Sequence, residues 1–171
     1  MRVFAAASID RFDGLQELMS ELSEIKACRI VKTPQLHLTF RFFGEIDGEI
    51  LSTVRSEFRK ISGKKFALNL QGLGAFPNKS RASVMFLNAQ NNEEIMFNYG
   101  CIMSIPPTGR NEKKFKPHIT IARFKNRLDC RELCTRHQSL SYSGDINKLS
   151  LYKSELTEDG PVYTEIEKVQ L

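Results

Sequence analysis

The sequence predicts an α+β fold made of two similar halves that meet at a cleft. A tetrad of the form His, apolar, Thr, apolar occurs twice, at residues 37–40 and 118–121. An aspartate that can cap a helix follows each tetrad, Asp47 in one copy and Asp129 in the other, and a pair of strand-like stretches comes next. A chain of 171 residues has the length of one domain, so we expect residues 1–171 to form a single domain of two pseudo-symmetric lobes.

Each tetrad is typical of a strand with two different faces, because polar and apolar residues alternate in it. His37 and Thr39 point to the same side of such a strand, roughly 6–7 Å apart, and the two apolar residues point to the core. His118 and Thr120 repeat the arrangement in the second half. If the two strands lie near each other, two imidazoles and two hydroxyls come together.

These four side chains can perform acid–base chemistry on a phosphate without a metal ion. A neutral histidine takes a proton from the nucleophile, and a protonated histidine gives one to the leaving oxygen. The threonine hydroxyls donate hydrogen bonds to the non-bridging oxygens. A lone histidine on a strand is usually an ordinary surface or core residue, but a repeated tetrad in a chain with three histidines favours a catalytic pair.

The elements of the first half follow from periodicity and turn residues. A buried strand at 2–8 precedes a helix that starts at Asp10, with Asp10 or Asp13 as its cap. The apolar residues of this helix recur at helical spacing: Leu15, Leu18, Met19, Leu22 and Ile25. A short strand begins at Ile30, and the first histidine strand spans about 36–43.

The middle of the chain alternates between helices and strands. The helix capped by Asp47 is followed by a strand at 65–73, a loop at 72–81 and a partner strand at 82–88. Phe76 in this loop either stacks on a base of a bound RNA or packs on the core. Both interpretations of Phe76 stay open.

The last third of the chain contains two helices and a hairpin. One helix starts at Asn91 or Asn92 and ends at the prolines 106–107, and a polar connector at 108–116 leads to the second histidine strand. A final helix, capped by the aspartate at 129, runs to about Gln138. The C-terminal hairpin is formed by two strand-like stretches: 141–154 and 162–169.

The cysteines and the third histidine allow a second kind of site. Cys130, Cys134 and His137 share a helix face, which is compatible with a metal ligand set. Ordinary reduced cysteines are the better interpretation, since no Cys-x-x-Cys spacing occurs. His137 is expected to be solvated and unrelated to the tetrads.

Two arginines follow the tetrads at different offsets. Arg41 is four residues after His37 and so shares the histidine's face, whereas Arg123 is five residues after His118 and falls on the other face unless the strand ends or bulges there. Strand geometry therefore favours Arg41 as a phosphate ligand.

Composition and charge place limits on the protein's surroundings. The net charge is +5 and the pI about 9.1, which fits an anionic partner such as RNA. No apolar run is long enough for a membrane span, and the N-terminal apolar stretch is too short for a signal peptide. A cytoplasmic location is expected.

The tetrads and several further stretches resemble the 2H phosphoesterase superfamily, in the branch of RNA 2′,3′-cyclic phosphodiesterases that were historically called 2′-5′ RNA ligases. The resemblance runs through the whole chain in family order, over these segments: 2–6, 37–44, 72–77, 115–123 and 151–156 with Gly160 and Tyr163. Two departures are mild: Phe40 replaces a more usual aliphatic residue, and the strand at 83–86 lacks a tryptophan often found there.

The resemblance implies two antiparallel sheets around a central cleft, with helices on the outside. It implies hydrolysis of RNA 2′,3′-cyclic phosphate ends to 2′-phosphates, with His37 and His118 as acid and base and with neither metal nor cofactor. Thr39 and Thr120 would bind the phosphate. It also favours Arg123, since His-x-Thr-x-x-Arg is the pattern of the second motif. A monomer that acts on RNA ends, tRNA fragments among the candidates, is expected.

Three alternatives stay open. A 2′-5′ RNA ligase would join cyclic-phosphate and 5′-hydroxyl ends in the same site. A non-catalytic RNA-binding module would retain the tetrads without turnover. A metal-dependent hydrolase would use the two histidines as ligands, but acidic ligands are missing from both motifs.

Overall fold

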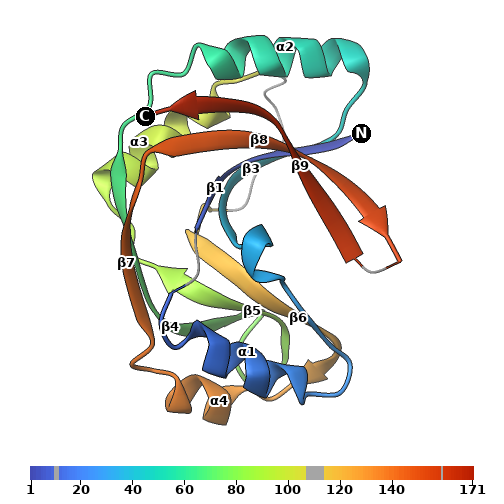
Figure 1. The fold of residues 1–171 in the computed structure, drawn as a ribbon, viewed down its shortest axis with the longest axis vertical. Coiled ribbons are helices and arrows are strands. Elements are labelled where there is room, and N and C mark those ends of the chain that lie inside the picture. Colours follow the sequence, from blue (N-terminus) through green and yellow to red (C-terminus); the bar gives the residue numbers. More distant parts are fainter. Residues whose placement is uncertain (10–11, 107–113, 159) are drawn as a thin grey trace.

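The computed structural model describes residues 1–9, 12–106, 114–158 and 160–171. Over these residues nine strands form one curled antiparallel sheet in the order β7-β4-β5-β6-β3-β1-β8-β9, with β2 paired to β6 (Figure 1). The strand bounds are β1 Arg2–Ser8, β2 Cys28–Ile30, β3 His37–Glu45, β4 Phe66–Phe76, β5 Ala82–Ala89, β6 His118–Leu128, β7 Ser141–Ile146, β8 Lys148–Thr157 and β9 Gly160–Gln170. The helices are α1 Leu15–Ser23, a 3-10 turn Thr33–Gln35, α2 Gly48–Arg59, α3 Glu93–Met103 and α4 Arg131–Arg136.

The sheet consists of two arms of four strands each that meet at the histidine strands, and the ninth strand, β2, is added beside β6 of the second arm. The first arm is β3-β1-β8-β9 and the second is β6-β5-β4-β7. Among the described residues, β3 and β6 are paired through a single residue pair, Leu38 with Ile119. The two predicted antiparallel sheets are therefore the two arms of one continuous sheet.

Helices cover the outer faces of both arms, as predicted (Figure 1). Helices α2 and α3 pack on the first arm, and α1 and α4 pack on the second. The side chains that α1 buries are those its spacing predicted: Leu15, Leu18, Met19 and Leu22. Asp47 caps α2, since its carboxylate accepts a hydrogen bond from the amide of Ile50 at 2.9 Å.

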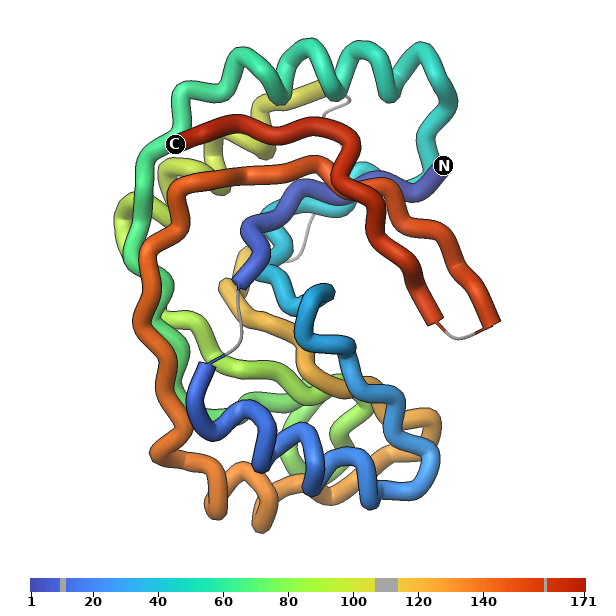
Figure 2. The backbone as a smooth tube through the Cα atoms, viewed as in Figure 1, coloured from blue at the N-terminus to red at the C-terminus, as the bar shows by residue number. Residues whose placement is uncertain are grey.

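The chain passes between the arms repeatedly, as the tube in Figure 2 shows. After β1 in the first arm, it forms α1 on the second and returns for β3. Helix α3 follows β5 of the second arm but packs on β3 of the first. Neither arm is therefore a contiguous piece of the sequence.

Two predicted helix starts are wrong. Helix α1 begins at Leu15 after Gly14, whose left-handed conformation (φ 77°) turns the chain without a side-chain cap; Asp10 lies outside the described residues. Helix α4 begins after Cys130, although the carboxylate of Asp129 does accept from the amide of Arg131 at 3.1 Å. It ends at Arg136, two residues before the predicted end.

Three strand predictions also need correction. The stretch 141–154 is two strands, because the chain changes arms at Asn147: β7 pairs with β4, and β8 pairs with β1. Strand β4 continues to Phe76, into the predicted loop. Strand β2 starts at Cys28 rather than Ile30. The connector predicted at 108–116 lies outside the described residues up to 113.

Candidate active site

The junction of the two arms brings the tetrads together. Leu38 and Ile119 face each other in an antiparallel pair and are fully buried. Continuing this register places His37 opposite Thr120 and Thr39 opposite His118, so all four side chains lie on the other face of the sheet. The prediction that the two strands converge is thus met by direct pairing.

Both histidine strands carry a β-bulge at the same place in the motif. In β3 the pairing with β1 skips one residue between Thr39 and Arg41, and in β6 the pairing with β5 skips one between Thr120 and Ala122. A bulge interrupts the alternation of faces. Consequently two successive residues after each threonine are buried: Phe40 with Arg41, and Ile121 with Ala122.

The bulges give the two arginines different surroundings. Arg123, five residues after its histidine, is exposed and borders the cavity of the tetrads. Arg41, four residues after its histidine, is turned inward and only 5% exposed, although part of it borders the same cavity. The argument from simple strand alternation, which favoured Arg41, is wrong because the bulge shifts the face.

Arg41 instead connects β3 to the end of α3. Its Nη1 donates to the carbonyls of Ile102 at 3.1 Å, Met103 at 3.3 Å and Ile105 at 2.5 Å, and its guanidinium lies 4.6 Å from the centre of the Phe43 ring. Carbonyls at a helix C-terminus lack partners within the helix, and a cation is favourable there. These contacts give Arg41 a structural role.

The backbone orients both imidazoles in the same way. Nδ1 of His37 lies 2.6 Å from the carbonyl oxygen of Gln35, and Nδ1 of His118 lies 2.6 Å from that of Lys116. A carbonyl oxygen can only accept, so in each ring Nδ1 carries a proton. Nε2 is left as the atom that gains or loses a proton at each histidine.

Aromatic rings surround each imidazole. Phe4 and Tyr163 lie 5.0 Å and 5.4 Å from the ring of His37, and Phe86 and Phe76 lie 5.0 Å and 5.1 Å from that of His118. Burial in this apolar setting lowers the pKa of both histidines from its usual value near 6.5. The hydrogen bonds to the carbonyls oppose this shift, and the charge of Arg123 adds to it.

A cavity of about 860 Å³ opens over these groups. Its volume is in the range of ordinary small-molecule sites. The lining includes the side chains discussed above: His37, Thr39, His118, Thr120, Arg123 and Tyr163. Further cations border it, namely Arg29, Lys32, Lys114 and Lys116, so the cavity is suited to an anion.

Phe76 lies at the border of the cavity. Its ring packs 4.4 Å from that of Phe86, with Lys116 Nζ 5.5 Å from its centre. Phe76 therefore packs against the buried ring of Phe86, which agrees with the core-packing interpretation. Its ring also borders the cavity, which the base-stacking interpretation requires.

Sequence reasoning did not identify Tyr163 and Phe42 as site residues. Tyr163 lies beside His37 because β8 pairs with β1 and β9 pairs with β8. No local sequence pattern indicates this pairing of distant strands. Phe42 occupies the position after the bulge that corresponds to Arg123, is 60% exposed and borders the cavity. The repeated tetrad could have identified Phe42, because Phe42 follows His37 by five residues just as Arg123 follows His118, provided that a bulge is assumed in both strands.

The third histidine lies away from the cavity. Nε2 of His137 is 2.6 Å from Oε2 of Glu21, and its side chain is 12% exposed, so the expectation that it is solvated is wrong. The sulfur atoms of Cys130 and Cys134 are 3.9 Å apart. In the part of the chain that the structure describes, no three His, Cys, Asp or Glu side chains are grouped as a metal site would require.

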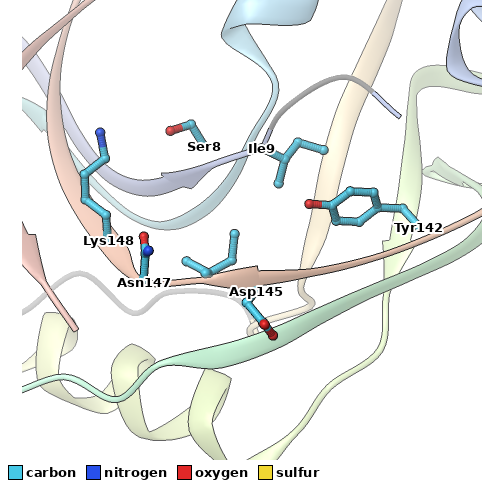
Figure 3. A pocket seen from close by; sticks show the side chains of 7 residues that line it. Ser8, Ile9, Tyr142, Asp145, Asn147 and Lys148 are labelled. Carbon is cyan, nitrogen blue, oxygen red and sulfur yellow. The ribbon is translucent and has the colours of Figure 1, made fainter. Parts of the chain in front are cut away.

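A second, smaller pocket of about 220 Å³ lies where the chain changes arms (Figure 3). Its lining residues come from the ends of β1, β7 and β8 and include Ser8, Tyr142 and Lys148. No residue of the tetrads contributes to it.

No helix among the described residues has the length and apolar character needed to span a membrane.

Comparison with known proteins identifies the family. A model of LigT-like phosphoesterases matches residues 8–86. An RNA 2′,3′-cyclic phosphodiesterase of Methanothermobacter thermautotrophicus is 31% identical, with the alignment covering 100% of both chains. The chain belongs to the LigT-like phosphoesterase family. The resemblance to the 2H superfamily is thereby confirmed.

Other relatives of this LigT-like phosphoesterase agree. An RNA 2′,3′-cyclic phosphodiesterase of Archaeoglobus fulgidus is 26% identical and covers 97% of this chain and 98% of its own. Among solved structures, Escherichia coli LigT complexed with NADP⁺ superposes with a TM-score of 0.76 at 25% identity, covering 99% of this chain and 97% of its own. A protein of Thermus thermophilus gives a TM-score of 0.71 at 27% identity, covering 100% of this chain and 98% of its own. The whole fold is thus that of the family.

Proposed function

We propose that this LigT-like phosphoesterase hydrolyses RNA 2′,3′-cyclic phosphate ends to 2′-phosphomonoesters by two-histidine acid–base catalysis without a metal ion. The observation that supports this most is the matched pair of imidazoles. Each has its Nδ1 bound to a backbone carbonyl and lies on the face of the sheet that borders the cavity. Relatives that span the chain are named RNA 2′,3′-cyclic phosphodiesterases, which supports the substrate class of the proposal.

In the proposed reaction the two histidines act in opposite senses. One histidine takes a proton from water at its neutral Nε2, and the water oxygen bonds to phosphorus. The P–O3′ bond breaks, and O3′ receives a proton from Nε2 of the other, protonated histidine. The proton gained by one imidazole and the proton given up by the other leave the protonation states of the pair exchanged. Exchange with solvent then restores it.

Other residues of the cavity stabilise the phosphate. The hydroxyls of Thr39 and Thr120 donate to non-bridging oxygens, and the guanidinium of Arg123 neutralises the charge that develops there. Phe76 stacks on the terminal base. Every group in the proposal comes from one chain, so a monomer suffices. The natural substrates in this view are cytoplasmic RNA ends such as those of tRNA fragments.

The test is hydrolysis of an RNA that ends in a 2′,3′-cyclic phosphate, in EDTA. Wild-type protein should yield a 2′-phosphate, and His37→Ala and His118→Ala should each lower kcat by about 10²–10⁴-fold, the usual contribution of a general acid or base. His137→Ala, which removes the third histidine far from the cavity, is the matched control and should keep full activity.

Several outcomes would contradict the proposal. Loss of activity in EDTA that added metal restores would point to the metal-dependent alternative. Folded wild-type protein without turnover would favour the non-catalytic RNA-binding role. A joined product in the presence of a 5′-hydroxyl RNA, in place of hydrolysis, would indicate the ligase.

A further inference from the structure

Strand β6 continues beyond the cavity as a row of cations. Arg123, Lys125 and Arg127 occupy every second position and are all exposed. Phe124 between the first two is buried, so Arg123 and Lys125 point to the same outward side, which Arg123 shares with the cavity. We name Arg123, Lys125 and Arg127 the β6 basic row.

The row is reinforced from the neighbouring strand. Arg29 of β2 pairs directly opposite Arg123 and is exposed as well. Like charges that face each other across two strands destabilise a sheet. The repulsion between Arg29 and Arg123 therefore destabilises the folded chain in the absence of a ligand. A bound polyanion would offset this repulsion.

Acidic side chains do not neutralise the row. Within the described residues, none of its three cations, nor Arg29, lies within ion-pair distance of a carboxylate. Arginines elsewhere in the chain do have such partners: Arg55 and Arg59 with Glu167, Arg131 with Asp129, and Arg136 with Glu21 and Glu132. The polar contact of Arg127 is a 3.5 Å hydrogen bond to the carbonyl of Arg81.

The spacing of the row suits a nucleic-acid backbone. Two residues of an antiparallel strand extend about 7 Å, so Arg123 and Lys125 follow one another at a step comparable to that between phosphates of an extended single strand. The pairing with β5 shifts register between Arg123 and Leu128, so Arg127 is placed in the row by its exposure and by its hydrogen bond to the carbonyl of Arg81. Strand β6 leads from the tetrad at the junction of the arms toward the half covered by α1 and α4 (Figure 1). The row thus connects the cavity with the outer surface.

We infer that the β6 basic row binds the RNA chain on the 5′ side of the cyclic phosphate, with Lys125 and Arg127 each neutralising one backbone phosphate. This inference rests on the proposed function. A 2′,3′-cyclic phosphate ends its RNA at the 3′ side, so the remaining chain can only continue in the 5′ direction. With the terminal phosphate at the histidines and Arg123, the preceding phosphates follow the row outward.

The test measures how binding depends on salt. A 5′-fluorescein hexaribonucleotide with a 3′-phosphate is titrated with the protein at increasing salt, and binding is followed by fluorescence anisotropy. Each phosphate contact contributes about 0.7 to the slope of log Kd against log salt for a single strand. The double variant Lys125→Gln with Arg127→Gln should therefore reduce the slope by about 1.4. When the salt concentration rises fourfold, the affinity of the wild type should then fall by a factor about sevenfold larger than the affinity of the variant does.

A matched control removes the same charge elsewhere. Lys60 and Lys65 are exposed at the end of α2 and in the loop after it. Lys60→Gln with Lys65→Gln should keep the wild-type slope. An unchanged slope in the Lys125/Arg127 variant would show that these two side chains make no phosphate contacts. An equal fall of the slope in the control would assign the effect to net charge. Either result would overturn the inference.

Kinetics separates this inference from the proposed function. If both hold, the Lys125/Arg127 variant should lower the ratio of kcat/KM for a cyclic-phosphate hexanucleotide to that for a nucleoside 2′,3′-cyclic phosphate, which has no second phosphate. Turnover by wild type with an unchanged ratio and slope would refute the row and keep the phosphodiesterase. A reduced slope without any turnover would refute the phosphodiesterase and keep the row as an RNA-binding surface.

Discussion

Replacing Arg123 and Arg41 by glutamine, one at a time, separates substrate binding from stability. Both variants lose one positive charge beside the same cavity, so each is the other's control. Arg123 is exposed there and has no ion-pair partner among the described residues, whereas Arg41 is buried and binds three carbonyls. Arg123→Gln should impair catalysis, and Arg41→Gln should impair folding stability.

The expected sizes follow from the contacts. A hydrogen bond to a charged group contributes about 1.5–3 kcal/mol. At about 1.4 kcal/mol for each factor of ten, Arg123→Gln should lower kcat/KM by about 10- to 150-fold. The same range, applied to Arg41 and converted at about 2–4 °C for each kcal/mol, predicts a fall in Tm of about 3–12 °C.

Two measurements check this pair: kcat/KM on a nucleoside 2′,3′-cyclic phosphate, and thermal unfolding followed by circular dichroism. Activity is compared at a temperature where both variants are folded. If Arg41→Gln loses as much activity as Arg123→Gln while it keeps its Tm, the assignment based on the bulges is refuted. Retention of full kcat/KM by Arg123→Gln would exclude its proposed phosphate contact.

Two further predictions concern pH and base stacking. Because burial lowers the pKa of both His37 and His118, kcat/KM should be bell-shaped and centred below about pH 6.5: it rises as the base loses its proton and falls as the acid loses its own. A maximum above that value in a pH–rate profile would contradict this. Phe76→Ala should raise KM about 5- to 150-fold, equivalent to about 1–3 kcal/mol of stacking, with little change in kcat; an unchanged KM would leave Phe76 with a packing role alone.

The geometry of the candidate site was largely predictable because its central pattern is local. The alternation of His37 with Thr39 and of His118 with Thr120 is determined by strand geometry within four residues, and the repeat identifies the two strands as partners. The apolar spacing of α1 and the cap of α2 are local in the same sense.

What the sequence could not reveal depends on pairing between distant strands. The bulges that turn Arg41 inward and Arg123 outward arise from the register of β3 with β1 and of β6 with β5. Tyr163 reaches the site through the pairing of β8 with β1. The change of arms at Asn147 likewise interrupts a stretch that alternates continuously in sequence.

The repeated passage of the chain between the arms has a consequence for how the active site is assembled. The first arm takes its strands from both ends of the sequence, and α3, which covers it, lies between two strands of the second arm. No single cut in the backbone can release an intact half. His37 lies between Phe4 of β1 and Tyr163 of β9, so its surroundings are complete only when strands from both ends of the sequence have joined the first arm.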